Sequence, residues 1–248
     1  MLPDNYLPDT DLLKDRVILV TGAGDGIGRV AAITYARHGA TVVLLGRTVS
    51  KLEAVYDEIV DEGLPEPGII PMDLGSASLD DFQQIYDVLE ENYERLDGLL
   101  HNASILGDRV PLEHYDPNQF MKVMHVNFNA VFILTRFLVP LLRKPKDAAI
   151  IFSSSGVGRT PRAYWGAYAL SKYATEGLNI LLADELENTS DIRVNVINPG
   201  ATRTSMRAAA YPNEDPRTLK TPEDIMPLYL YLMGPDSQSV HGESINAQ

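Results

Sequence analysis

Thr21-Gly22-Ala23-Gly24-Asp25-Gly26-Ile27-Gly28 is the stretch that decides the fold of this 248-residue chain. The β-branched run Arg16–Val20 precedes it and predicts a buried strand, and Ile27–His38 predicts the helix that it opens. Glycines at this spacing allow a tight turn and a close approach of a ligand to the backbone. Free N–H groups at the start of the helix would face that ligand. The stretch therefore predicts a loop for the pyrophosphate of a dinucleotide; a glycine-rich turn that binds nothing is the alternative.

Short β-branched runs alternate with longer helical patterns along the rest of the chain. Further strands are predicted at 41–45, 68–72, 98–101, 148–152 and 192–197, with an edge strand at 243–245. Helices are predicted at 50–62, 79–93, 116–143, 164–188 and 222–233. This alternation predicts a single α/β domain over residues 1–248, with residues 1–13 as an N-terminal extension. We expect a Rossmann fold, a doubly wound and mostly parallel sheet of about seven strands with helices on both faces.

The most unusual residues of the chain come just after the predicted strands. They are Gly22–Gly28, Arg47, Asp73, Asn102, Ser155 and Pro199–Thr204. Right-handed crossovers bring the carboxyl ends of parallel strands to one edge of a sheet, where ligands bind. We therefore expect these residues to form one site.

Charge and composition exclude several classes of protein. The formal net charge of −13 repels nucleic acid and anionic membranes, so neither is expected as a partner. The chain has no cysteine, which excludes disulfides and thiolate catalysis, and its five histidines lack metal-ligand spacing, so no metal is expected. Residues 1–14 lack a signal-peptide pattern and no apolar run reaches transmembrane length, so a cytoplasmic protein is expected.

The end of the second predicted strand distinguishes the two nicotinamide cofactors. An acidic residue there would accept a hydrogen bond from a ribose 2′-OH. The run Leu44–Thr48 has no acid and contains Arg47, whose planar guanidinium suits a 2′-phosphate. NADP(H) is therefore favoured over NAD(H), although Asp25 counts against a strongly phosphate-binding wall. A solvated arginine at the start of a helix is the alternative for Arg47.

Tyr168 and Lys172 share one face of a predicted helix, one turn apart. A nearby ammonium group lowers the pKa of a tyrosine from its usual ~10 toward neutral pH, as a general acid or base requires. Ser155 follows the fifth predicted strand and is placed to donate a hydrogen bond to a substrate carbonyl, with Ser153 and Ser154 as adjacent alternatives. Asn127 lies inside a predicted helix, where asparagine is disfavoured, so a buried polar role competes with a solvated position.

Taken in order, these motifs resemble the short-chain dehydrogenase/reductase family, in its branch of about 250 residues. The resemblance runs from about Lys14 to Gln248. The family's Asn-Ser-Tyr-Lys tetrad falls on Asn127, Ser155, Tyr168 and Lys172. Its cofactor-binding positions fall on Thr21, Gly22, Gly24, Asp25, Gly26, Ile27, Gly28, Arg47, Asp73, Leu74, Asn102, Ala103, Tyr168, Lys172, Pro199, Gly200, Thr202 and Thr204.

Two details refine the resemblance. His101 and Ser104 replace the outer residues of the family's Asn-Asn-Ala-Gly motif, so the adenosine pocket is expected to differ in shape. Trp165–Tyr168 and Asp224–Leu230 resemble the bacterial YciK-type subgroup of oxidoreductases.

The resemblance implies hydride transfer between NADP(H) and a small carbonyl or alcohol substrate. Tyr168 would give or take the oxygen-bound proton, and Ser155 would orient that oxygen. Lys172 would hold the nicotinamide ribose and lower the Tyr168 pKa, and Asn127 would hold a water in a proton relay. A 3-oxoacyl-type reductase and a non-catalytic dinucleotide-binding sensor or scaffold are the alternatives.

Two further expectations concern the surface. Residues 203–220 follow the sixth predicted strand and by resemblance would cover the substrate, with an ordinary surface loop as the alternative. In the family that the chain resembles, the helices matching 116–143 and 164–188 pack against their symmetry mates, so the resemblance implies a homodimer or homotetramer. The surplus of apolar residues on these predicted helices is consistent with it.

Overall fold

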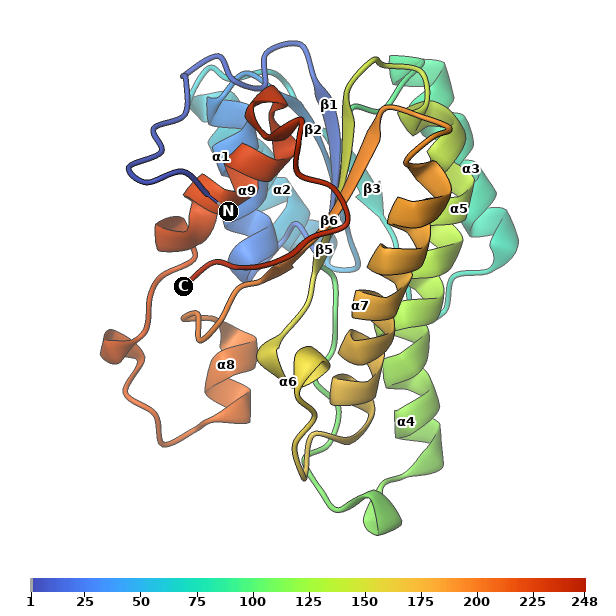
Figure 1. The fold of residues 1–248 in the computed structure, drawn as a ribbon, viewed down its shortest axis with the longest axis vertical. Coiled ribbons are helices and arrows are strands. Elements are labelled where there is room, and N and C mark those ends of the chain that lie inside the picture. Colours follow the sequence, from blue (N-terminus) through green and yellow to red (C-terminus); the bar gives the residue numbers. More distant parts are fainter. Residues whose placement is uncertain (1) are drawn as a thin grey trace.

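Seven strands form one sheet in the order β3-β2-β1-β4-β5-β6-β7 (Figure 1). The computed structural model describes residues 2–248. The strands are β1 (Val17–Thr21), β2 (Thr41–Gly46), β3 (Gly68–Pro71), β4 (Gly98–His101), β5 (Ala148–Ser153), β6 (Ile192–Asn198) and β7 (Ser244–Asn246). All six neighbouring pairs are parallel, β6 and β7 included, where a mostly parallel sheet was expected. The strand order reverses between β1 and β4, which opens a crevice at their carboxyl ends.

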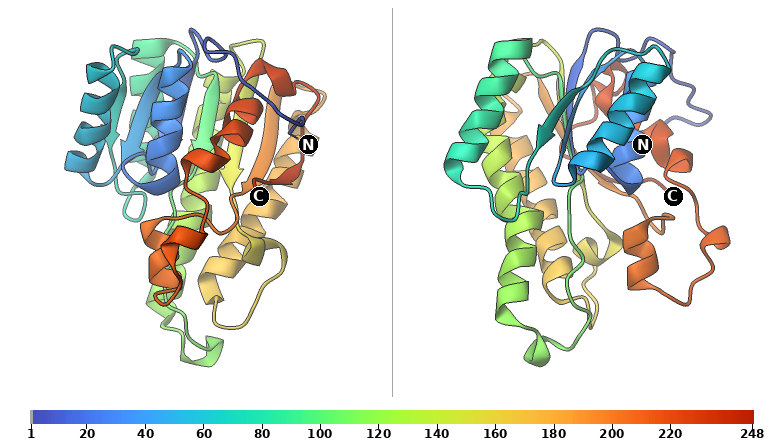
Figure 2. Two further views of the ribbon diagram at one scale, coloured as in Figure 1. Left: turned by 90° about the vertical axis from the view of Figure 1, so that its left-hand side faces the viewer. Right: turned by 180° about the vertical axis from the view of Figure 1, so that it is seen from behind.

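Helices cover both faces of the sheet (Figures 1 and 2). One layer consists of α1 (Gly26–Arg37), α2 (Val49–Asp61) and α9 (Met226–Met233). The other consists of α3 (Leu79–Tyr93), α4 (Pro117–Met124), α5 (Ala130–Leu142) and α7 (Gly166–Leu186). Strands β1, β4 and β5 are buried along their whole length, which explains why their sequences are apolar at nearly every position.

Short elements fill the connections. They are α6 (Gly156–Arg159), α8 (Ser205–Ala210), the π-helical turn η2 (His125–Asn129), and the 3₁₀ turns η1 (Leu112–His114), η3 (Pro216–Thr218), η4 (Glu223–Ile225) and η5 (Pro235–Ser237). The sequence reasoning missed α6 and α8, because one or two turns are too short for a clear helical period. The helix predicted at 164–188 starts later, at Gly166, since Tyr164 adopts a left-handed φ of 71°.

The helix predicted at 116–143 is helical from Pro117 to Leu142, with the π turn in its middle. Asp116 caps its start by accepting hydrogen bonds from the N–H groups of Asn118 and Gln119. By length and apolar composition this helix is long enough to cross a membrane, contrary to expectation, yet half of its apolar stretch is buried inside the protein. It therefore serves as a core helix of this fold.

The first residues of the chain lie against α9. Leu13 is fully buried and its N–H donates to the carbonyl of His38 at 2.9 Å. The ring of Tyr6 meets Tyr231 edge-on with centroids 5.2 Å apart, and its hydroxyl donates to Asp236 at 2.8 Å. The N-terminal extension is thus part of the packed structure.

The loop before α1 leaves no room for a side chain at Gly28. A Cβ atom there would lie 2.3 Å from the carbonyl oxygen of Gly22 and 2.6 Å from Nδ2 of Asn102. Gly28→Ala is therefore expected to lower the free energy of unfolding by about 1–3 kcal/mol, measured by urea denaturation. The control is Gly177→Ala, in the interior of α7, whose added Cβ meets nothing within 4 Å and is expected to stabilise slightly. Equal unfolding free energies for the two variants would contradict this prediction.

Candidate active site

The glycine loop between β1 and α1 is fastened to the end of β4. Thr21 Oγ1 accepts hydrogen bonds from the N–H groups of Asn102 at 3.0 Å and Ala103 at 3.1 Å. Gly22 has a φ of 69°, and a Cβ atom on it would lie 2.9 Å from the Cα of Ala103. Only glycine satisfies both the backbone angle and the contact. The loop therefore turns sharply at the point where the strand order reverses.

A cleft of about 410 Å³ runs along the carboxyl ends of the strands. All the predicted cofactor residues line it except Thr21 and Gly28, which support the loop from within. Asp25 is the N-cap of α1, but its carboxylate makes no capping hydrogen bond. The N–H groups at the start of α1 are thus left without a side-chain cap and suit a bound phosphate.

Ser155, Tyr168 and Lys172 meet in the same cleft. Tyr168 is only 8% exposed, and the Ser155 side chain is close enough to lower its pKa. Lys172 is also buried and donates through Nζ to the carbonyl oxygen of Ser153 at 2.7 Å. The Lys172 ammonium lies 5.8 Å from the centre of the Tyr168 ring, which agrees with the predicted shared face of α7.

The three serines after β5 have different surroundings. Ser153 Oγ donates to Asn102 Oδ1 at 3.4 Å. Ser154 Oγ is buried and has no hydrogen-bond partner among the described residues. Of the three, only Ser155 acts on the pKa of Tyr168, which its side chain lowers, and this favours Ser155 over its neighbours. The unpartnered Ser154 hydroxyl and the uncapped amides of α1 fit a polar cofactor in this cleft.

Burial dominates the protonation of the pair on α7. Burial raises the pKa of Tyr168 to about 12, and the hydrogen bond from Ser155 opposes it. Burial lowers the pKa of Lys172 to about 8, against the attraction of the Glu176 carboxylate. The expectation that Lys172 brings the Tyr168 pKa down toward neutral pH is therefore wrong for this geometry. Desolvation of the phenolate outweighs the effect of Ser155, and the Lys172 ammonium is bonded to a backbone carbonyl.

Asn127 is buried in the π turn η2 and does not line the cleft. Its Oδ1 accepts a hydrogen bond from the N–H of Ile105 at 2.8 Å, and its Nδ2 donates to the carbonyl of Ile105 at 2.9 Å. Nδ2 also donates to Ser171 Oγ at 3.1 Å. The side chain thus ties the loop after β4 to α7. The relay water predicted at Asn127 stays a prediction, because these hydrogen bonds occupy only its side-chain amide.

His101 replaces a family asparagine without adding a charge. Its ring stacks on Phe152 with centroids 5.1 Å apart, and Nε2 lies 2.8 Å from Thr135 Oγ1. Burial, and then the nearby Lys172, lower the pKa of His101 to about 3. The imidazole is therefore neutral at physiological pH and supports the wall of the site from behind.

One end of the cleft is apolar and lies beside Tyr168. It is lined by Leu106, Trp165, Met206 and Ala210. The guanidinium of Arg109 lies 4.3 Å from the centre of the Trp165 ring and donates to the carbonyl of Ala210. The sequence alone did not indicate this contact, because the residues come from three separate segments.

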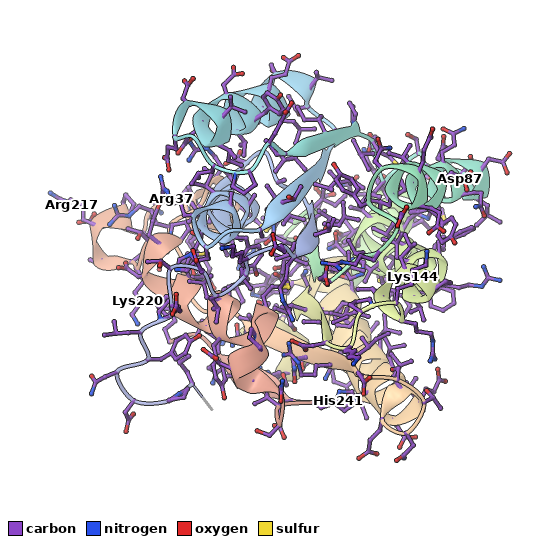
Figure 3. The ribbon with its side chains drawn as sticks, turned by 90° about the horizontal axis from the view of Figure 1, so that it is seen from above. Arg37, Asp87, Lys144, Arg217, Lys220 and His241 are labelled. Atoms are coloured by element: carbon purple, nitrogen blue, oxygen red, sulfur yellow. The ribbon has the colours of Figure 1, made fainter. Side chains whose placement is uncertain are left out.

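Residues 203–220 leave and rejoin the body of the protein at one point. The buried Thr202 pairs with Lys220 in a parallel bridge, and the N–H of Arg203 donates to the Lys220 carbonyl at 2.8 Å. Arg217, at the outer edge of this segment, points away from the protein (Figure 3). In contrast, Thr204 lies against the glycine loop, 3.4 Å from where a Cβ of Gly26 would be. The first part of the segment, from Thr204 to Ala210, therefore borders the cleft.

The chain belongs to the short-chain dehydrogenase family, whose model matches residues 16–215. It is 54% identical to the uncharacterized oxidoreductase YciK of Escherichia coli K12, over 98% of this chain and 96% of that protein. A putative short-chain dehydrogenase from Pseudomonas syringae has a TM-score of 0.97 at 57% identity, covering 98% of this chain and 99% of that one. Another, from Shigella flexneri 2a strain 301 and complexed with NADP, has a TM-score of 0.94 at 54% identity, covering 97% and 100%.

Burying the Lys172 ammonium has a cost in stability. Lys172→Met is expected to raise the free energy of unfolding at pH 7 by about 1–3 kcal/mol, because the charged form is disfavoured in the folded state. The gain shrinks as the pH rises from about 8 toward 10.5, where the folded lysine has lost its proton and the unfolded one keeps it. Urea denaturation at pH 7 and pH 10 measures both, with the exposed Lys146→Met as the control. A loss of stability at pH 7 would contradict the prediction.

Proposed function

We propose that this protein is an NADP(H)-dependent oxidoreductase that interconverts a small carbonyl compound and its alcohol. The observation that carries the proposal is the meeting of Ser155, Tyr168 and Lys172 in the cleft shaped by the glycine loop. Crystallisation of a Shigella flexneri relative with NADP supports the choice of cofactor. We propose that the enzyme acts in the cytoplasm.

The residues that would hold the cofactor follow from their positions along the cleft. The loop Gly22–Gly28 and the start of α1 would take the pyrophosphate. Arg47, exposed at the end of β2, would face the 2′-phosphate, while Asp73 and Leu74 at the end of β3 would border the adenine. Near Tyr168, the nicotinamide would be held by Pro199–Thr204.

When bound, the nicotinamide supplies or takes up the hydride. With a pKa of about 12 in the free protein, Tyr168 is protonated at physiological pH and would be the proton donor as negative charge develops on a carbonyl oxygen. The Ser155 hydroxyl holds that oxygen by a hydrogen bond that strengthens as negative charge develops. Lys172 would hold the ribose and attract the phenolate that is left. Asn127 positions the loop at Ile105 and the helix that carries Tyr168.

We further propose that residues 203–220 cover the substrate. Arg109 supports this role because it links the loop after β4 to α8 through the Ala210 carbonyl and through the ring of Tyr211, 5.0 Å away. Arg207 in α8 donates two hydrogen bonds to Glu214, each 2.6 Å long, which stiffens the segment. The apolar lining at this end favours a substrate with an uncharged, apolar part next to the carbonyl.

The proposed assembly state rests on exposed apolar side chains of α5 and α7, which cover the face of the sheet opposite α1. Phe132 in α5 and Tyr173, Ile180 and Leu181 in α7 are about half exposed or more. Exposed apolar residues on neighbouring helices are typical of subunit contacts. We propose a homodimer or homotetramer in which α5 and α7 meet their symmetry mates.

Tyr168→Phe is expected to lower turnover by about 10²- to 10⁴-fold while NADPH affinity is retained, because the phenyl ring fills the same space but has no proton to transfer. Turnover is measured as NADPH oxidation across a panel of aldehydes, ketones and a 3-oxoacyl thioester. The control is Tyr56→Phe in α2, whose hydroxyl donates to Glu66 outside the cleft and which is expected to behave as wild type. Full activity in Tyr168→Phe would overturn the proposed function.

Arg47→Asp is expected to shift cofactor preference from NADPH toward NADH. The substitution replaces a cation with an acid that accepts from a ribose 2′-OH and repels a 2′-phosphate. The Michaelis constants for both cofactors, measured with the same substrate, test the exchange. An unchanged Michaelis constant for NADPH would show that Arg47 has no part in binding the phosphate.

A further inference from the structure

Asp25 and Lys51 form an ion pair across the mouth of the cofactor cleft. Lys51 Nζ lies 2.5 Å from Asp25 Oδ2 and joins the first turn of α2 to the glycine loop. Both residues line the cleft at the same end as Arg47. The Cβ of Lys51 would lie 2.9 Å from a Cβ on Gly24, so the absence of a side chain at Gly24 lets the lysine lie directly against the loop.

The Asp25–Lys51 ion pair is weak enough for Lys51 to exchange its partner. The side chains of Lys51 and Asp25 are 52% and 53% exposed, and ion pairs so exposed to water are weak. Lys51 lowers the pKa of the Asp25 carboxyl through their hydrogen bond, so the carboxylate is charged at neutral pH. A 2′-phosphate carries close to two negative charges and three acceptor oxygens, and so attracts the ammonium group more strongly than one carboxylate does.

We propose that Lys51 is a second cation for the 2′-phosphate of NADP(H), beside Arg47, and that Asp25 competes for it when no 2′-phosphate is present. NADH, which has only a 2′-OH at this position, leaves the Asp25–Lys51 pair intact. NADPH separates the pair and takes up Lys51. The acidic residue in the glycine loop thereby has a counter-ion in the free protein, and the exchange adds to discrimination between the two cofactors. The proposal rests on the proposed NADP(H)-linked function.

First-turn geometry on α2 supports this assignment. The first turn contains no acidic residue, and the N-cap Thr48 makes no side-chain capping hydrogen bond. The uncapped amides at the start of α2 and the Arg47 guanidinium thus lie near Lys51 in the cleft. The Lys51 ammonium itself is paired with the Asp25 carboxylate. An anion placed among these groups meets two cations and the positive end of a helix dipole.

The test is calorimetric titration of the full chain with NADPH, NADH, adenosine 2′,5′-bisphosphate and 5′-AMP, which needs no substrate. Lys51→Met is expected to weaken binding of the two ligands with a 2′-phosphate about tenfold, and to leave NADH and 5′-AMP unchanged. Lys51→Arg is expected to restore most of the affinity. Asp25→Asn is expected to tighten NADPH binding about threefold without affecting NADH, because the competitor for Lys51 has lost its charge.

The surface pair Asp11–Lys14 provides matched controls. Lys14 Nζ lies 3.7 Å from Asp11 Oδ2, and both side chains are exposed. Lys14 lies beside Gly39 and precedes β1, at the opposite end of that strand from the cleft. Lys14→Met and Asp11→Asn make the same changes in net charge and are expected to leave all four affinities unchanged. An effect equal to that of the cleft variants would reduce the result to overall charge and overturn the proposal.

The titrations distinguish failure of the proposed NADP(H)-linked function from failure of the Lys51 proposal. A wild-type protein that binds NADPH no better than NADH would overturn the proposed NADP(H) function, and the Lys51 proposal with it. A wild-type preference for NADPH that Lys51→Met leaves unchanged, or a loss in Lys51→Met that is equal for NADH, would overturn the Lys51 proposal alone. Thermal unfolding of each variant verifies that both exposed substitutions leave the fold intact.

Discussion

Thr21 Oγ1 accepts two backbone hydrogen bonds from the segment after β4, and through them the loop after β1 is held against Asn102 and Ala103. The strand order reverses at this junction, so the contact fixes how wide the crevice can be. Gly22 and Gly28 lack the side chains that would force the loop away from β4. This close approach determines the floor of the cleft and the direction of α1. It also determines how far the residues after β5 extend into the cleft.

Burial gives the residues on α7 their chemistry. Removing Tyr168 from water keeps its phenol neutral, and removing Lys172 from water weakens the hold of the ammonium on its proton. The fold supplies this desolvation by packing α7 against α4, α6, β6 and η2, and Asn127 links α7 to the loop at Ile105 by hydrogen bonds. The same packing lowers the free energy of unfolding, because it buries a charge at the site. Such a loss is common where a buried charge serves function.

Much of the architecture was predictable because it is encoded locally. Strands buried on both faces must be apolar along their length, and helices between them must carry an apolar face, so their order can be read from a single sequence. Predicted cofactor residues gather at one sheet edge for the same topological reason. Short helices such as α8 were not predicted, and the observed boundaries near Tyr164 and Ser244 differ from the predicted ones. Backbone angles at these places depend on neighbouring segments.

The sequence by itself determined the fold class, the glycine loop and the spacing of Tyr168 and Lys172, since each follows from periodicity or from backbone freedom within a few residues. Tertiary structure decided which serine faces Tyr168, whether Asn127 is solvated, and the direction in which the Tyr168 pKa moves. It alone paired Asp25 with Lys51, 26 residues further along the chain. Hydrogen bonds and desolvation act between groups that are close in space, and distance along the chain does not report that closeness.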